Sequence, residues 1–193
     1  MNFFFEIIIA PEYDLKALNI LQTKKNRIIL KLGDTSLITK VTYRSILNGI
    51  IYQERDVFID CEEILEKITK LKPTKAQLED LLFASIICKH TKSNAIVLIK
   101  DKQLIGIGCG QTSRVDALKQ AILKAKSFGF NLEGSVLASD AFFPFPDCIE
   151  IASKQGIKAV IQPGGSINDK LSIDCCNKNK IAMVLTKVRH FKH

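Results

Sequence analysis

Short apolar runs separated by polar residues are typical of β-strands, and they dominate the first part of the chain. Phe3–Ile9 and Arg27–Leu32 are predicted to be strands, and Asp14 is predicted to cap a short helix between them. The next segment is rich in β-branched residues. Within it, Asn48-Gly49 favours either a hairpin turn or one strand with a glycine for close packing.

A helical repeat of apolar positions begins after a connector at Lys70–Pro73. Thr74 and Ser113 each begin a capping-box pattern, which predicts one helix from Thr74 to about Lys89 and another from Ser113. The side chains expected to face the core are Leu78, Leu81, Leu82 and Ile86 in the first helix and Val115, Leu118, Ile122 and Leu123 in the second. Between the helices, the pattern predicts a hairpin of Ala95–Lys100 and Gln103–Gly108.

Strands and helices alternate in the rest of the chain. Strands are expected at Ser135–Ala138, Ala159–Gln162 and Ala182–Thr186, with helices at Asp147–Gln155 and from Ser166. This alternation indicates a layered α/β fold, and the hairpin makes its sheet mixed. We expect a strand-rich segment over residues 1–70 and an α/β subdomain over residues 71–193.

Charge adds a constraint on partners. The chain of 193 residues carries a formal net charge of +8, and the surplus lies wholly in residues 71–193, with 18 Lys+Arg against 10 Asp+Glu. A basic surplus indicates an anionic partner, such as a nucleic acid, a membrane surface, or a phosphorylated or polycarboxylate small molecule. Nucleic acid is disfavoured because no Lys/Arg-rich run occurs. No apolar window approaches the roughly 20 residues of a membrane helix.

The cysteines and the N-terminal segment indicate a cytoplasmic protein. The six cysteines include no CxxC pair, which favours reduced thiols. The apolar start lacks a basic n-region, and Glu6 interrupts it, so a signal peptide is not expected.

Glycines and one arginine form the first candidate site. Gly106-Ile-Gly108-Cys-Gly110 follows a predicted strand and precedes a helix start, so it favours either close approach to a phosphate or a tight turn alone. Arg114 lies at that helix start, and Asn94 precedes the hairpin. Asn94 and Arg114 are candidates to share one anionic or amide ligand, although each taken singly fits a surface or capping role.

Two loops after predicted strands form the second candidate site. The stretch Ser139–Asp147 holds three Phe, two Pro and two Asp residues, which suits a flat heteroaromatic ligand stacked on a ring and hydrogen-bonded by a carboxylate. A rigid crossover in which Asp147 caps the next helix is the alternative. Pro163–Ser166 contains two glycines that leave backbone groups exposed for hydrogen bonding.

The basic C-terminal residues allow two interpretations. Arg189 is either a phosphate clamp or part of an untethered tail. His190 and His193 lack a Cys or acidic partner at recognisable spacing, so no metal site is expected. Lys89-His90 lies at a helix end, where it would interact with the helix dipole.

Several long motifs together resemble one family. They are FFEIIIAPEYD, LKPTKAQLEDLLFA, KHTKSNAIV, GIGCGQTSRVDA, GSVLASDAFFPFPD, GIKAVIQPGGSINDK and RHFKH. They resemble the C-terminal half of the bifunctional purine biosynthesis family, which joins aminoimidazole carboxamide ribonucleotide (AICAR) formyltransferase to IMP cyclohydrolase. The resemblance implies a cytidine-deaminase-like α/β fold and formyl transfer from 10-formyltetrahydrofolate to AICAR, with no metal and no nucleic-acid partner.

The resemblance also implies roles for individual residues. Asn94 and Arg114 match residues that hold the nucleotide's base and carboxamide, and Arg189 matches a residue near its phosphate. The residues matching the folate site and formyl-transfer centre are Phe142, Pro144 and Asp147, together with Gly165 and Ser166, whose loop backbone meets the pterin.

Three departures qualify this resemblance. The family's catalytic Lys-His pair is expected upstream of Met1, the cyclohydrolase domain has no counterpart, and Pro146 replaces an Arg found in many relatives. The chain is therefore expected to act in a homodimer or with a complementing N-terminal half. A non-catalytic remnant that still binds nucleotide or folate is the alternative.

Overall fold

The computed structural model describes residues 5–33 and 40–192 of the chain. They form two compact units, Met1–Arg55 and Asp56–His193. The structure therefore groups residues 56–70 with the α/β unit, whereas the sequence places the boundary at residue 70. The reason is an antiparallel pairing between β5 (Glu66–Lys67) and a much later strand, β10 (Ala182–Leu185), which composition does not reveal.

A strand–helix–strand motif opens the first unit. β1 (Ile7–Ala10) pairs in parallel with β2 (Ile28–Lys31), and α1 (Leu15–Gln22) connects them. The Asp14 side chain accepts hydrogen bonds from two N–H groups of the first helical turn, so the predicted cap is confirmed. Residues 3 and 4 of the predicted first strand lie outside the described residues.

A two-stranded hairpin completes the first unit. β3 (Val41–Ile46) pairs with β4 (Gly49–Glu54), and Ile46 lies opposite Gly49. The hairpin interpretation is therefore confirmed and the single-strand alternative is wrong. The turn residues are Leu47 and Asn48, one position earlier than expected, and Leu47 has a φ of +44°.

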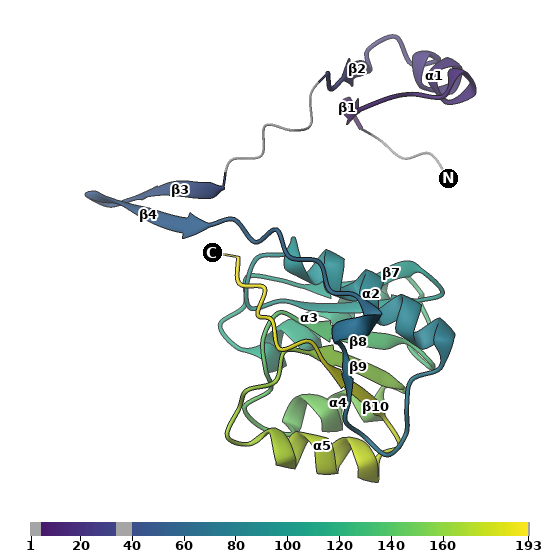
Figure 1. Cartoon of the computed structure of the whole chain (residues 1–193). Helices are drawn as coiled ribbons and strands as arrows, with labels where there is room; N and C mark the ends of the chain where they lie inside the picture. Colours follow the sequence, from purple (N-terminus) through teal and green to yellow (C-terminus); the bar gives the residue numbers. More distant parts are fainter. Residues whose placement is uncertain (1–4, 34–39, 193) are drawn as a thin grey trace. The chain divides into compact units, whose positions relative to one another are not determined.

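The second unit is built on a six-stranded mixed sheet (Figure 1). Its strand order is β5, β10, β9 (Ala159–Gln162), β8 (Val136–Ser139), β6 (Ile96–Lys100) and β7 (Gln103–Gly108). β8, β9 and β10 run parallel, whereas β6 is antiparallel to both of its neighbours. The expected layered α/β class with a mixed sheet is confirmed.

Helices cover both faces of this sheet. They are α2 (Lys75–Lys89), α3 (Arg114–Ser127), α4 (Asp147–Lys154) and α5 (Asp169–Lys178), and a short 3₁₀ helix, Glu62–Ile64, precedes β5. The capping box at Thr74 is confirmed. At Ser113 the side chain caps the helix, but the Asp116 carboxylate accepts from the Ser113 hydroxyl, so only half of the predicted capping box is confirmed. No helix within the described ranges is long and apolar enough to cross a membrane.

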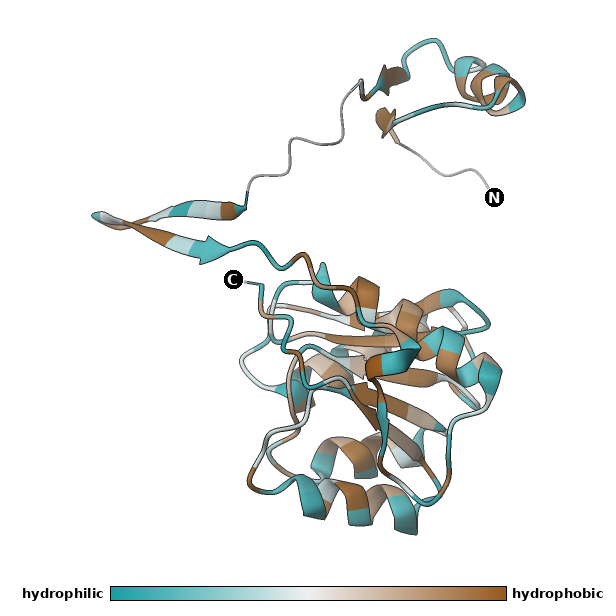
Figure 2. Cartoon of the chain, in the orientation of Figure 1, coloured by the Kyte–Doolittle hydropathy of each residue, from teal (hydrophilic) through white to brown (hydrophobic). Residues whose placement is uncertain are grey.

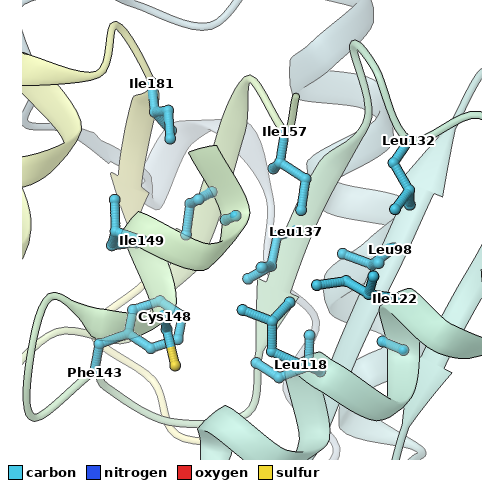
Figure 3. Packing of buried hydrophobic residues seen from close by; sticks show 14 of the residues in the cluster. Leu98, Leu118, Ile122, Leu132, Leu137, Phe143, Cys148, Ile149, Ile157 and Ile181 are labelled. Atoms are coloured by element: carbon cyan, nitrogen blue, oxygen red, sulfur yellow. The ribbon is translucent and has the colours of Figure 1, made fainter. Parts of the chain in front are cut away.

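Alternating sheet residues divide the core into two layers. Val97 and Ile99 belong to the cluster that contains α2 residues, whereas Ile96 and Leu98 belong to the cluster that contains residues of α3, α4 and α5. Figure 3 shows part of the second cluster, including Leu98. Since both faces are covered, the central strands are buried along their whole length and are mostly apolar (Figure 2). This explains why they appear in the sequence as unbroken apolar runs.

Gly106 and Gly108 allow α3 to approach β7 closely. A Cβ atom at Gly106 would lie 2.4 Å from the Ala121 carbonyl oxygen, and one at Gly108 would lie 1.9 Å from the Ala117 carbonyl oxygen. The helix therefore turns its small residues toward the sheet, and Leu123 is 68% exposed instead of facing the core as expected. The two glycines allow α3 to pack closely on the sheet, a role that the tight-turn interpretation did not include. A bound phosphate is not needed to explain them.

The β6–β7 turn is held by a carboxylate from α2. Asp101 and Lys102 have φ values of +52° and +60°, as a type I′ turn requires. The buried Asp80 accepts hydrogen bonds from both of their N–H groups, at 2.9 and 2.8 Å. Asp80 thus ties the hairpin to the helix beneath it.

Replacing Asp80 with alanine is expected to lower the free energy of unfolding by about 2–3 kcal/mol, because two charge-assisted hydrogen bonds are lost. Urea unfolding followed by circular dichroism measures the change. The matched control is Glu79→Ala, since Glu79 makes an exposed ion pair with Lys102 and its loss should change stability little. Equal effects of the two variants would contradict a structural role for Asp80.

Candidate functional site

The carboxyl ends of β8, β9 and β10 lie at one edge of the sheet because these strands are parallel. At such an edge, loops from successive strands meet and commonly form ligand sites. The loops that follow these strands carry most of the predicted site residues: Phe142, Pro144, Asp147, Gly165, Ser166 and Arg189. Asn94 and Arg114 reach the same region from the start of β6 and of α3.

A pocket of about 300 Å³ opens in this region. It is lined by Asn94, Thr112, Ser113, Arg114, Val115, Pro144, Phe145, Asp147 and Cys148. Four of the predicted residues, Asn94, Arg114, Pro144 and Asp147, therefore share one cavity. Sequence reasoning missed the other members, although Ser113 and Val115 could have been found as neighbours of Arg114. The convergence expected for Asn94 and Arg114 agrees with this geometry.

Arg114 supplies the positive charge of the pocket. Its side chain is 16% exposed, and one terminal nitrogen, Nη2, lies 3.8 Å from Oδ1 of Asp140, whose side chain is fully buried. Among the described residues, the buried Nε atom of Arg114 has no hydrogen-bond partner, and neither has either carboxylate oxygen of Asp140. The guanidinium thus balances a buried charge at a distance and retains donor capacity for a ligand.

Asn94 is anchored to the segment that leads into α3. Its side-chain Nδ2 donates to the Gln111 carbonyl at 2.9 Å, and its own N–H donates to the same carbonyl at 3.3 Å. This pairing holds the amide at the wall of the pocket, next to the helix start that carries Arg114.

Asp147 occupies the first turn of α4 and also lines the pocket. Its Oδ1 accepts a hydrogen bond from the Cys148 N–H at 2.8 Å, but the N-cap position belongs to Pro146, so the prediction that Asp147 caps this helix is wrong. As an acidic residue of the first turn, Asp147 still interacts favourably with the helix dipole. Burial, reinforced by the negative charge of Asp147, raises the pKa of the Cys148 thiol to about 12. Cys148 therefore remains a neutral wall residue, not a nucleophile.

Phe142, Arg189 and Gly165 form a second group. The Arg189 guanidinium carbon lies 4.6 Å from the centroid of the Phe142 ring, within cation–π range. A Cβ atom built on Gly165 would lie 3.7 Å from an Arg189 terminal nitrogen, so this backbone passes beside the guanidinium. Residues from three loops therefore meet here.

The Pro163–Ser166 loop is closed by Asp169. Its Oδ2 accepts hydrogen bonds from the N–H groups of Gly165 and Ser166, at 2.7 and 3.2 Å. These donors, which the sequence left exposed for a ligand, are therefore occupied within the chain. Ser166 is not the helix cap; its Oγ accepts from Asn168, whose side chain donates to the Pro144 carbonyl and so joins the two loops.

The segment that carries Arg189 is tethered, so the interpretation as a free tail is wrong. The His190 N–H donates to the Asp140 carbonyl at 3.1 Å. Lys192 and Ser93 form two hydrogen bonds, both at 3.0 Å. The Lys192 N–H donates to Oγ of Ser93, and the Ser93 N–H donates to the Lys192 carbonyl. His193 lies outside the described residues.

His190 is buried between two aspartates, Asp56 and Asp60. The sequence did not reveal these acidic partners because they lie more than 100 positions earlier. Within residues 5–33 and 40–192, no group of three or more His, Cys, Asp or Glu side chains is arranged to hold a metal ion.

Lys89 and His90 do not form a functional pair. Lys89 is buried and its ammonium group donates to the Phe58 carbonyl, whereas the side chain of His90 is exposed at the end of α2. All six cysteines are free, as expected.

Comparison with known proteins decides the family. The family model described as "AICARFT/IMPCHase bienzyme" matches residues 1–124. The bifunctional purine biosynthesis protein PurH of Bacteroides thetaiotaomicron is 60% identical over 190 residues, which cover 98% of this chain and 37% of that protein. This chain belongs to the AICARFT/IMPCHase bienzyme family. The resemblance expected from the motifs is thereby confirmed.

Other members of the bienzyme family match to a similar extent. PurH of Aquifex aeolicus is 50% identical over 192 residues, which cover all of this chain and 37% of that protein. This chain thus spans little more than a third of the length of these relatives.

Two of the solved structures that match part of this chain are named as deaminases. The dCMP deaminase of cyanophage S-TIM5, in complex with dCMP and dUMP, covers 57% of this chain and 98% of its own, with 16% identity and a TM-score of 0.42. A diaminohydroxyphosphoribosylaminopyrimidine deaminase/5-amino-6-(5-phosphoribosylamino)uracil reductase of Thermotoga maritima covers 56% of this chain and 34% of its own, with 20% identity and a TM-score of 0.38. Nothing about activity follows at these scores.

The residues carried over from the bienzyme family thus fall into two adjacent groups. The pocket holds Asn94, Arg114, Pro144 and Asp147, and the second group holds Phe142, Gly165 and Arg189. The loop 140–147 contributes to both, and Ser166 lies in the loop that the Asn168 side chain ties to it.

Proposed function

We propose that this chain forms the nucleotide- and folate-binding part of an AICAR formyltransferase in purine (IMP) biosynthesis, with 10-formyltetrahydrofolate as the formyl donor. The observation that carries the proposal is the pocket that brings Asn94, Arg114 and Asp147 together, with Arg189 lying over Phe142 of the loop 140–147 that also lines this pocket. Family membership supports it, because the family's description names AICAR formyltransferase.

The nucleotide would be held by the basic and amide side chains. The guanidinium of Arg189 suits a phosphate, since its donors match phosphate oxygens in pairs. The Asn94 amide and the Arg114 guanidinium suit the base and its carboxamide oxygen. The position of these residues in or next to one cavity supports a single ligand that spans them.

The folate would be held by the loop 140–147 and its neighbour. Phe142 and Pro144 offer apolar surface to a flat ring, and the carboxylate of Asp147 can accept hydrogen bonds from the pterin amide. The basic surplus of residues 71–193 fits the carboxylates of a folate tail.

Formyl transfer requires a base in addition to these contacts. The AICAR amine nitrogen attacks the formyl carbon, the bond from that carbon to N10 of the folate breaks, the amine loses a proton and N10 gains one. An aryl amine is a weak nucleophile, so a positioned base and charge stabilisation are needed. Lys89 and His90 do not meet at the pocket, so we assign proton transfer to a Lys-His pair from a complementing N-terminal half.

Exposed apolar residues support an association of this kind. In the first unit, Ile7, Ile9, Ile28 and Leu30 are 53%, 58%, 50% and 45% exposed, and apolar positions follow its strands (Figure 2). Surfaces of this kind are typical of segments that pack against another chain or domain. A homodimer or a complementing half would cover them.

A mixing experiment tests the proposal. Formyl transfer from 10-formyltetrahydrofolate to AICAR is measured for the chain alone, for the remainder of the Bacteroides thetaiotaomicron relative alone, and for the two together. We expect turnover in the mixture only. Full activity of the isolated chain would contradict the proposal. A mixture that is as inactive as its separate parts would also contradict it.

Calorimetric titration separates catalysis from binding alone. If the mixture is inactive but the chain binds AICAR, and binding weakens in Arg114→Ala and Asp147→Ala, the non-catalytic remnant is the better description. The matched control is Arg44→Ala, which removes an exposed arginine in the other unit. Absence of AICAR and folate binding would rule out both descriptions.

A further inference from the structure

The buried side chain of His190 lies between the carboxylates of Asp56 and Asp60, and these two aspartates are called the cage below. Its Nδ1 lies 2.5 Å from Oδ2 of Asp56, its Nε2 lies 3.1 Å from Oδ2 of Asp60, and its side chain is 5% exposed. Both aspartates come from the segment before the 3₁₀ helix, far from His190 in the sequence. The cage therefore joins the beginning and the end of the α/β unit.

The geometry favours the doubly protonated imidazolium. An ionised carboxylate only accepts hydrogen bonds, so a ring nitrogen facing each of two carboxylates must carry a proton. Burial, the largest single influence, acts to lower the pKa of His190. Hydrogen bonds to Asp60 and Asp56 and the charges of these aspartates outweigh it, and the pKa is raised above its ordinary value.

Other charged and polar groups complete the cage. The Ser85 hydroxyl donates to Asp60, and the Lys89 ammonium lies 3.8 Å from Oδ1 of Asp56. With His190 protonated, two cations face two anions. Without that proton, the buried group carries one uncompensated negative charge, which is costly away from water. On the remaining side, the loop at Asp140 presents its backbone carbonyl to His190, and the Asp140 carboxylate faces Arg114.

His190 is connected directly to the Arg189 group. Its side chain is held by the cage, and its N–H donates to the Asp140 carbonyl at 3.1 Å. Asp140 lies two residues before Phe142. Arg189, the residue before His190, lies over the Phe142 ring. The residues on both sides of the Arg189–Phe142 contact are therefore fixed to His190.

We propose that His190 is a positioning residue that, held between Asp56 and Asp60, fixes Arg189 over Phe142 and presets its guanidinium for an anionic phosphate group. The phosphate rests on the proposed function, whereas the positioning of Arg189 does not. Presetting matters because an arginine ordered before binding loses less conformational freedom when the ligand arrives.

Positioning by a charged His190 makes the arrangement dependent on pH. Because the folded-state pKa of His190 is raised, its contribution is fully present below the unfolded-state value of about 6.5. The contribution is lost as the pH rises through the folded-state pKa. The Arg189–Phe142 contact should therefore loosen on the alkaline side of that pKa.

NMR of the full chain tests the proposal without any ligand. Long-range ¹⁵N–¹H spectra distinguish the imidazolium of His190 from its neutral tautomers, and the Arg189 side-chain protons report the ring current of Phe142. We expect His190 to titrate above the ordinary histidine range and the ring-current shifts of Arg189 to vanish with the same midpoint. Shifts that persist after His190 has lost its proton would overturn the proposal.

Variants provide a second test. His190→Gln and Asp56→Asn should each abolish the ring-current shifts at neutral pH, whereas the matched control His90→Ala, an exposed histidine at the end of α2, should leave them unchanged. If His190→Gln does not fold, the titration of the unaltered chain still decides. Retained shifts in a folded His190→Gln would contradict the proposal.

Binding of inorganic phosphate then separates this inference from the proposed function. We expect His190→Gln to weaken phosphate binding about three- to tenfold, through lost ordering of one side chain. If the unaltered chain binds neither phosphate nor AICAR but the Arg189 shifts still follow His190, the proposed function fails and the positioning role stands. If phosphate binds equally to both proteins, the presetting role is wrong.

Discussion

Replacing Arg114 with methionine is expected to abolish most nucleotide binding and to lower the free energy of unfolding of the α/β unit by about 3–5 kcal/mol. The reason is that the fully buried carboxylate of Asp140 loses its cationic neighbour, since Arg114 lies 3.8 Å away and no described residue donates a hydrogen bond to either oxygen. Urea unfolding measures the stability, and calorimetric titration with AICAR measures the binding.

A second substitution separates the two effects. In the double variant Arg114→Met with Asp140→Asn, the buried charge is gone, so much of the lost stability should return while AICAR binding stays weak. A double variant that regains affinity together with stability would show that Arg114 acts only through the fold. Unchanged stability in the single variant would contradict the burial argument.

Replacing Gly108 with alanine is expected to destabilise the α/β unit by about 3 kcal/mol or more. The new Cβ atom would lie 1.9 Å from the carbonyl oxygen and 2.9 Å from the Cα atom of Ala117. Both obstacles are backbone, so relief requires α3 to move away from β7 and to lose packing along its length. Chemical unfolding followed by circular dichroism measures the effect.

Gly49→Ala is the matched control for this prediction. Gly49 also lies in a strand, but a Cβ atom there would meet only the Ile46 carbonyl oxygen, at 3.8 Å. We expect little change in stability. If Gly108→Ala were equally harmless, the close approach of α3 to β7 would not depend on the absence of a side chain.

Local signals in the sequence predicted most of the elements. The Thr74 capping box, the Asp14 and Ser113 caps and the hairpin ending at Gly108 depend on residues within a few positions of one another, and each is confirmed. The motifs added the family and, through it, a set of residues that the structure brings together in the pocket and beside Arg189.

The sequence predicted less well which helical side chains are directed toward the core. Leu123 and Ile86 were expected in the core, but they are 68% and 39% exposed. Apolar periodicity favours the large residues, and Leu118 and Ile122 are indeed buried, but α3 lies against Gly106 and Gly108 through alanines, because the close approach to β7 leaves room only for small side chains. The signal that could have shown this is the combination of a Gly-x-Gly strand with alanines at every fourth helical position.

Partners distant in sequence could not be predicted at all. The acidic neighbours of His190 lie before the 3₁₀ helix, and nothing in the spacing around His190 points to them. Such pairs depend on which loops the sheet brings together.

The position of His190 in the chain has a consequence for protein synthesis. The ribosome completes all six strands of the sheet before it adds Arg189 and His190, because β10 ends at Leu185. Until then, the nascent α/β unit carries Asp56 and Asp60 without their histidine. Translation that stops shortly after β10 would therefore release a chain with a complete sheet, two aspartates whose charge Lys89 alone cannot balance, and no Arg189.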